Sequence, residues 1–217
     1  KYLVEFEMNF TRNGGKVIWA QDAAEANEAI LDICRKYDAK QVVKSKSMVT
    51  EEIHLNDFLA ANQIESVETD LGEYIQQLDG EPPYHIVTPA MHKSKEDVAK
   101  LFHSKLGVEP NLSPNELTLV ARKNLRAKYT SAEIGVTGGN FLLADIGGVC
   151  VTENEGNGRL TTAFPKVHIA IVGIEKIIPS VKDLNLYWPL LATYGTGQNV
   201  TVYNTIFTGG RKSGEVD

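Results

Sequence analysis

The sequence has little cysteine, no basic surplus and no long apolar run. Only Cys34 and Cys150 occur, without a CxxC spacing, so these 217 residues encode neither a disulfide framework nor an iron–sulfur site. The formal net charge of −6 argues against general binding to nucleic acid, which requires a basic excess. The apolar runs fall far short of the roughly 20 residues that span a bilayer, and no charged-then-apolar leader precedes them. We therefore expect a cytoplasmic globular protein that acts on small molecules, with no membrane span.

Familiar catalytic and phosphate-binding motifs are missing as well. No glycine is followed by the Lys–Ser or Lys–Thr of a Walker A loop, and the glycines at 138–139 and 195–197 do not fit a G-x-G-x-x-G turn. There is no G-x-S-x-G elbow, and the five histidines show no i, i+4 pairing, so we expect no metal site. Cys150 stands in the apolar run "GGVCVT", which favours a buried small residue over a reactive thiolate.

Up to about residue 107 the sequence alternates short β-branched runs with helical segments. This alternation is typical of βαβ units around a mainly parallel sheet. Capping signals begin helices at Asp22, Asp70, Ser94 and Ser113, the last followed by Pro114 at the first helical position. The expected strands are 16–20, 41–45, 65–70 and 84–90, and the other expected helices are 2–13 and one through 53–59.

From residue 135 onward the pattern changes, and glycine-rich turns separate consecutive predicted strands. "NFLLADI", "GVCVTEN" and "KVHIAIVGI" predict strands, followed by a helix near 180–192 and a strand at 199–207. We predict one α/β domain over residues 1–217, with a mainly parallel sheet sandwiched by helices in 1–134 and a more antiparallel β unit in 135–217. Because the chain starts at Lys1 and stops in the polar stretch "TGGRKSGEVD", we expect it to be a fragment of a longer polypeptide.

Polar residues follow three of the predicted strands, where open α/β sheets place their ligands. For any one of them a helix cap or a solvated loop charge is the simpler explanation, but three such strand ends together favour a shared crevice. Its lysines could bind a carboxylate or a phosphate. The candidate ligand-binding residues are Lys44, Ser45, Lys46, Ser47, Glu68, Asp70, His92 and Lys93.

The segment "TENEGNGRL" is the second candidate. Glu153 and Glu155 are two residues apart, so in a strand their carboxylates would converge on one side, where they could act as nucleophile or base. Asn154, Gly156 and Asn157 would line the same ligand site. A hairpin turn at 156–158 is the alternative, because glycine and asparagine tolerate positive φ.

Four blocks together resemble a known family: "VVKSKSMV" (42–49), "ETDLGEYIQQL" with "GEPPYHIVTPAMHK" (68–93), "GVTGGNFLLADIGGVCVTENEGNGRL" (135–160) and "PKVHIAIVGIEKIIPS" (165–180). In this order, and over nearly the whole chain, they resemble the LUD domain of LutB-like lactate-utilisation iron–sulfur proteins. The resemblance implies a sandwich like that of the NagB/RpiA/CoA-transferase group. It supplies no catalytic residues, although fold kinship with CoA-transferases suggests Glu153 or Glu155 as an acyl acceptor.

The resemblance also implies a function. It suggests a component of an oxidoreductase complex that oxidises L-lactate to pyruvate, acting with an iron–sulfur partner subunit and a second LUD protein. Two [4Fe–4S] clusters for electron transfer are expected in a C-terminal part of the parent protein, and no cofactor in this chain. The predicted cleft of Lys44, Lys46, Asp70, His92 and residues 153–158 would then hold an anionic small molecule. Two alternatives remain: an enzyme that handles acyl-CoA or sugar phosphates, and a non-catalytic docking scaffold.

Overall fold

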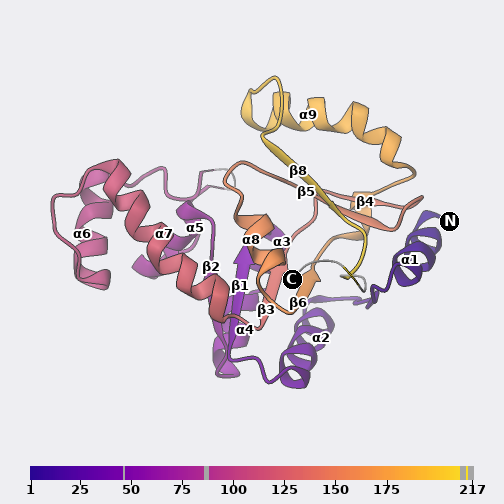
Figure 1. The fold of residues 1–217 in the computed structure, drawn as a ribbon, viewed down its shortest axis with the longest axis horizontal. Helices are drawn as coiled ribbons and strands as arrows, with labels where there is room; N and C mark the ends of the chain where they lie inside the picture. Colours follow the sequence, from indigo (N-terminus) through magenta and orange to yellow (C-terminus); the bar gives the residue numbers. More distant parts are fainter. Residues whose placement is uncertain (46, 86–87, 211–213, 215–217) are drawn as a thin grey trace.

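The chain folds around two β-sheets (Figure 1), described in a computed structural model for residues 1–45, 47–85, 88–210 and 214. Sheet A is parallel, in the order β2 (Glu65–Glu68), β1 (Gln41–Ser45), β3 (Ile134–Thr137) and β6 (Val167–Ala170). Sheet B is mixed, in the order β7 (Ile177–Ile178), β4 (Phe141–Leu143), β5 (Gly148–Glu153) and β8 (Tyr203–Phe207). In sheet B, β5 runs antiparallel to β4 and β8. The predicted α/β class, with a parallel sheet and a more antiparallel unit, is confirmed.

Helices cover both faces of sheet A. Because side chains alternate along a strand, Val42 of β1 faces one helical layer and Val43 the other. The Val42 side is covered by α2 (Ala23–Lys36) and α4 (Leu55–Ala61), through Leu31, Leu55 and other apolar side chains. The Val43 side is covered by α5 (Leu71–Asp79), α6 (Lys95–Leu106) and α7 (Pro114–Ser131). A short helix, α3 (Met48–Glu52), follows β1.

Helix α8 (Asn157–Ala163) rests directly on the backbone of sheet A. At Gly135 in β3, an added Cβ would collide with the carbonyl oxygen of Thr161. Only a residue without a side chain permits this approach, which brings α8 over β1 and β3. The glycine-rich chain beyond β3 therefore returns to the parallel sheet.

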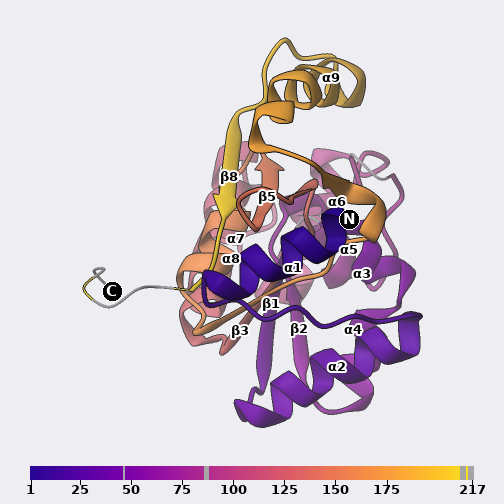
Figure 2. The same cartoon turned by 90° about the vertical axis from the view of Figure 1, so that its right-hand side faces the viewer.

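Sheet B lies between α1 (Tyr2–Arg12) on one face and α9 (Leu184–Thr196), with the 3₁₀ turn η2 (Val181–Asp183), on the other. Phe6 of α1 packs with Leu142 and Val151. Figure 2 shows α1 in front of the sheets, on the side that faces the viewer. The turn between β4 and β5 passes under α1 at Gly147, whose φ of +61° favours glycine. A second 3₁₀ turn, η1 (Ile174–Lys176), leads into β7.

The capping predictions at Asp22, Ser94 and Ser113 are confirmed. Ser94 and Ser113 each form a capping box with the acidic residue three positions on, and the Asp22 side chain accepts from the Glu25 N–H. Asp70 occupies the N-cap position of α5, as predicted, but its side chain makes no capping hydrogen bond there. The predicted strands at 41–45, 140–146, 148–154 and 166–174 contain β1, β4, β5 and β6. Strands 65–70 and 199–207 contain β2 and β8.

Two predicted strands are wrong. Residues 16–20 are not a strand, and Ile18 and Trp19 are exposed there. The described residues of 84–90 are not in a strand, since 84–85 form a bend and 89–90 a turn, while residues 86 and 87 lie outside the described part. A β-branched run becomes a strand only if a neighbour pairs with its backbone. In sheet A, β1 already has β2 on one side and β3 on the other.

The alternative of a hairpin turn at 156–158 is not found either. Gly156, with φ of +82°, turns the chain, and α8 begins at Asn157. Among the described residues, no helix combines the length and apolarity needed to cross a membrane.

Candidate functional site

Half of the buried polar side chains in the described chain, six of twelve, lie at the carboxyl ends of β1, β2 and β3. Parallel pairing sets Lys44 beside Glu68 and Ser45 beside Thr137, so the ends of these strands meet. The end of β5 and α8 complete this region, because α8 contacts β1, β3 and β5. We call it the polar edge, defined by Lys44, Ser45, Glu68, Thr69, Asp70, Thr137, Glu153, Asn157 and Thr161.

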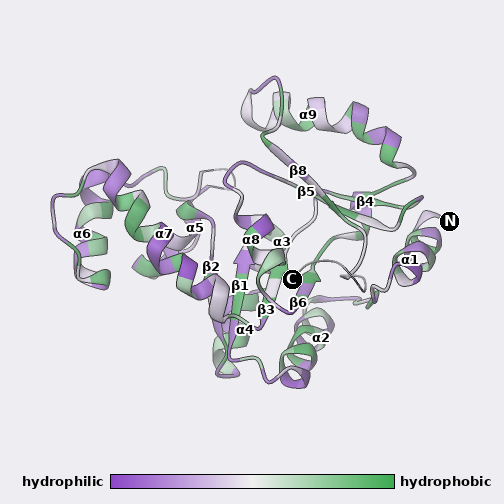
Figure 3. Cartoon of the chain, in the orientation of Figure 1, coloured by the Kyte–Doolittle hydropathy of each residue, from purple (hydrophilic) through white to green (hydrophobic). Residues whose placement is uncertain are grey.

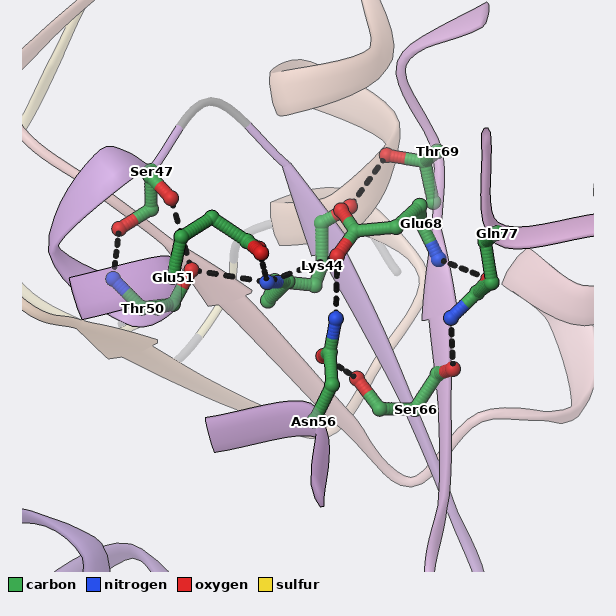
Figure 4. Close-up of polar contacts among 9 residues, drawn as sticks. All are labelled: Lys44, Ser47, Thr50, Glu51, Asn56, Ser66, Glu68, Thr69 and Gln77. Atoms are coloured by element: carbon green, nitrogen blue, oxygen red, sulfur yellow. Dashed lines mark hydrogen bonds and ion pairs between the residues drawn. The ribbon is translucent and has the colours of Figure 1, made fainter. Parts of the chain in front are cut away.

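Lys44 is the centre of the polar edge and is only 1% exposed. Its Nζ lies 2.5 Å from Glu51 Oε1, 2.7 Å from Glu68 Oε1 and 2.9 Å from Thr50 Oγ1 (Figure 4). An ammonium has three N–H donors, and these three oxygens account for all of them. The predicted binding of an anion by Lys44 would therefore require one of these partners to be displaced.

Hydrogen bonds hold Glu68 in place. Asn56 Nδ2 donates to its Oε1 at 2.9 Å, and Asn56 Oδ1 in turn accepts from Ser66 Oγ at 2.8 Å. Burial raises the pKa of Glu68 above its ordinary value, although Lys44 and Asn56 act in the opposite direction. With both carboxylates ionised, the Lys44–Glu51–Glu68 group carries one net negative charge inside the protein.

A second group of hydroxyls joins β1 to α8. Thr69 Oγ1 donates to the Lys44 carbonyl at 2.8 Å and lies 3.4 Å from Thr161 Oγ1. The Tyr129 hydroxyl reaches both threonines from α7, and burial raises its pKa to about 12. These contacts link Lys44 of β1 to Thr161 of α8 through uncharged hydroxyl groups.

Ser45 Oγ and Asn157 Nδ2 are buried donor atoms of the edge that have no hydrogen-bond partner within the described chain. Ser45 is the last residue of β1 and Asn157 the first of α8, which lies over β1 (Figure 1). A buried donor that stays unpaired costs about 1–3 kcal/mol. Two such donors on adjoining segments are what a site for a polar molecule would provide.

The predicted catalytic pair binds backbone amides. Glu153 is buried, and its two oxygens accept from Gly158 N at 2.6 Å and Arg159 N at 3.1 Å. It therefore stabilises the first turn of α8, where a carboxylate satisfies free amides. Glu155 is exposed beyond the end of β5 and accepts from Leu71 N at 3.2 Å. The expected convergence along one strand is wrong, because β5 ends at Glu153.

The other predicted residues have local roles or lie elsewhere. Ser47 is the N-cap of α3, accepting from Thr50 N, and Asn154 is exposed in the bend after β5. Lys46 lies outside the described residues.

His92 and Lys93 interact with acidic residues at the end of α5 and not with the Lys44 group. Lys93 pairs with Asp79 and Glu81, and His92 Nε2 lies 3.2 Å from Glu81 Oε2. Both line an open hollow of about 480 Å³. The structure thus brings Lys44, Ser45, Glu68, Asp70 and Asn157 into one region and leaves His92 and Lys93 in another.

Several residues of the site were missed by sequence reasoning. Thr50, Glu51 and Asn56 lie on the helices between β1 and β2, and only the fold turns them toward Lys44. Tyr129 and Thr161 had no sequence signal, since a lone hydroxyl on a helix is ordinary. In the described ranges, no group of three His, Cys, Asp or Glu is arranged to hold a metal ion.

Both cysteines are buried, as predicted for Cys150. Burial raises the pKa of each thiol, Cys34 and Cys150, to about 11, so neither is a thiolate at neutral pH.

Comparison with known proteins identifies relatives. A family model described as "LUD domain" matches residues 3–217. The chain is 47% identical over 217 residues to Lactate utilization protein B of Geobacillus sp. (strain WCH70), covering 100% of this chain and 46% of that protein. It is 44% identical over 216 residues to the "Uncharacterized electron transport protein YkgF" of Escherichia coli (strain K12), again covering 100% and 46%. The chain thus spans about half the length of these relatives. No solved structure matches it.

Proposed function

The chain belongs to the LUD domain family, and we propose that it is the LUD portion of a cytoplasmic electron-transport protein that takes part in oxidising L-lactate to pyruvate. The names of the relatives support this, since they refer to lactate utilisation and to electron transport. The proposal includes two [4Fe–4S] clusters elsewhere in the whole protein, a partner iron–sulfur subunit and a second LUD protein. These follow from the resemblance of the sequence.

The polar edge is the proposed ligand site, and the observation that carries this is the concentration of buried polar groups there. Ser45 Oγ and Asn157 Nδ2 are the donors with hydrogen-bonding capacity to spare. A 2-hydroxy or 2-keto acid has carboxylate and carbonyl or hydroxyl oxygens that could accept from them. Lys44 then acts as the internal counterion of Glu51 and Glu68.

Calorimetric titration of the whole protein with L-lactate and with pyruvate tests this site. Ser45→Ala or Asn157→Ala should weaken binding about tenfold, the equivalent of one hydrogen bond of about 1.4 kcal/mol. Asn115→Ala, an exposed asparagine of α7, is the matched control and should leave binding unchanged. Because Ser45 Oγ has no partner, Ser45→Ala should not lower the free energy of unfolding.

Growth on L-lactate tests the wider role. In a bacterium whose own copy has been deleted, the whole wild-type protein should restore growth on L-lactate, whereas Asn157→Ala should restore it poorly and Asn115→Ala fully. Normal growth of the deletion strain on L-lactate would refute the proposed function. If the Asn157→Ala and Ser45→Ala proteins restored full growth and bound both acids normally, the function would stand and the site would be wrong.

A further inference from the structure

Helix α9 is apolar on both of its faces. Leu184 and Ala192 are buried, and Leu184 packs with Tyr187 and Trp188 against Cys150 of sheet B. On the outward side the exposed apolar residues are Leu186, Leu190 and Tyr194, which are 61%, 43% and 83% exposed. Their spacing of four residues aligns them along one side of the helix, and we call them the α9 stripe. A helix that is apolar all round is normally buried.

The sequence segment that carries the stripe has no charged residue. From residue 184 to residue 210 the sequence has no Asp, Glu, Lys, Arg or His, although 23% of the whole chain is charged. Val200 and Val202, just beyond α9, are also exposed. In Figures 1 and 2 α9 stands at the outer end of the molecule, and in Figure 3 green, hydrophobic segments alternate along it with pale and purple ones. Interface cores lack charge in the same way.

A lipid surface does not fit this helix. Its 13 residues extend about 20 Å, against roughly 30 Å for a bilayer core. A helix that lies on an anionic membrane carries Lys or Arg on its polar face, and α9 has none. The occupant is therefore protein.

The size of the stripe also bears on the occupant. One row of side chains on a single helix is smaller than the roughly 800 Å² per partner of a stable complex, but it suits a contact between domains of one chain, which buries about 600–1,500 Å² in total. A linked domain is present at a high effective concentration and so needs less interface than a separate partner. A stripe that was bare whenever a partner dissociated would favour aggregation.

We propose that the α9 stripe is the docking surface for the remainder of the whole polypeptide, the part by which the relatives exceed this chain. Those relatives are more than twice as long as the region matched here, which spans 46% of each. The remainder covers Leu186, Leu190 and Tyr194 with an apolar surface of its own. This inference goes beyond the lactate role and uses none of the residues of the polar edge.

Hydroxyl-radical footprinting of the whole protein tests the proposal through two tyrosines. Tyr84 is 68% exposed and serves as the internal reference for Tyr194. If the stripe is covered, Tyr194 should be oxidised at least fivefold more slowly than Tyr84, at every protein concentration. Equal or faster oxidation of Tyr194 would overturn the proposal.

Charged variants identify what covers the stripe. Leu186→Lys with Leu190→Lys should raise the oxidation rate of Tyr194 to that of Tyr84. Leu119→Lys is the matched control, because Leu119 is 60% exposed on α7, and it should preserve the protection. Protection that disappears on hundredfold dilution, or a dimer in sedimentation that the double variant abolishes, would show a second copy as occupant. Protection that appears only with vesicles or another subunit would likewise overturn the proposal.

Discussion

Replacing Lys44 by methionine should strongly destabilise the protein, because Met is similar in length but leaves two carboxylates without their cation. The Lys44 and Glu68 side chains are 2% and 8% exposed, and their charged atoms are 2.7 Å apart. Removing one partner of such a buried pair costs about 3–5 kcal/mol. For a urea m-value of about 2 kcal/mol/M, the midpoint of unfolding at pH 7 should fall by roughly 1.5–2.5 M.

Glu68→Gln should cost much less than Lys44→Met. It leaves the neutral pair Lys44–Glu51 at 2.5 Å, and the glutamine oxygen can still accept from Asn56. The double variant Lys44→Met with Glu68→Gln should regain much of the stability lost in Lys44→Met, because the remaining carboxylate, Glu51, is partly exposed. The order of the urea midpoints of Lys44→Met, Glu68→Gln and the double variant therefore shows whether the unpaired buried charge causes the loss of stability. A loss of side-chain packing at Lys44 would not be reversed by Glu68→Gln.

The dependence on pH has a definite sign. A carboxyl whose pKa is raised in the folded state stabilises the folded protein below its unfolded pKa. This contribution is lost as the pH rises through the folded pKa. Removing Lys44 raises the pKa of Glu68 further, since the cation favours the ionised form. The loss in free energy of unfolding of Lys44→Met relative to wild type should therefore be largest at neutral pH. It should become smaller at lower pH, where Glu68 takes up a proton.

An exposed ion pair provides the matched control. Lys40 Nζ lies 2.7 Å from Asp38 Oδ1, but both side chains are more than 70% exposed. Lys40→Met should barely move the urea midpoint, because water screens this pair. If Lys44→Met changed the midpoint no more than Lys40→Met, or if Glu68→Gln were equally harmful, the account of the buried group would be refuted.

Two further predictions concern α8 and β6. Glu153→Gln should lower the free energy of unfolding by about 1–2 kcal/mol, because it removes the charge that binds the first amides of α8; Glu28→Gln, at an exposed position of α2, is the control, and equal losses in thermal or urea unfolding would contradict the role given to Glu153. Burial lowers the pKa of His168 to about 4, and its Nε2 lies 2.8 Å from Thr137 Oγ1. Because the folded pKa is lowered, the neutral His168 stabilises the protein above pH about 6.5, and this stability is lost as the pH falls toward 4. In His168→Gln the urea midpoint should therefore change less with pH between about 6.5 and 4. An unchanged slope would show that His168 is not the titrating group.

Predictions that depend on neighbours in sequence were the most successful. A capping box involves Ser113, Glu116 and the amides between them, all within one turn, so the beginning of α7 follows from local chemistry. The alternation of Val42 and Val43 likewise places β1 between two helical layers. The runs at 16–20 and 84–90 have similar local patterns, and they failed because strand formation depends on a partner elsewhere in the chain.

The candidate site shows the same division. That Lys44, Ser45, Glu68 and Asp70 lie at strand ends could be predicted, because parallel strands bring their carboxyl ends to one edge. It could not be predicted that Lys44 is buried with all of its N–H donors in use. Glu51 and Glu68 reach Lys44 only after α3 and β2 have packed. The pairing of Glu153 with the amides of α8 depended in the same way on how the chain turns at Gly156.

By itself, the sequence determined the α/β class, the family, the beginnings of the capped helices and the strand ends that carry polar residues. These depend on side-chain chemistry and spacing within about one turn or one strand. Only the tertiary structure decided which charges neutralise one another, which donors remain buried without partners and which apolar helix face is left uncovered. Those properties depend on contacts between residues far apart in the chain, and the energy of a charge or an apolar surface depends on whether packing removes it from water.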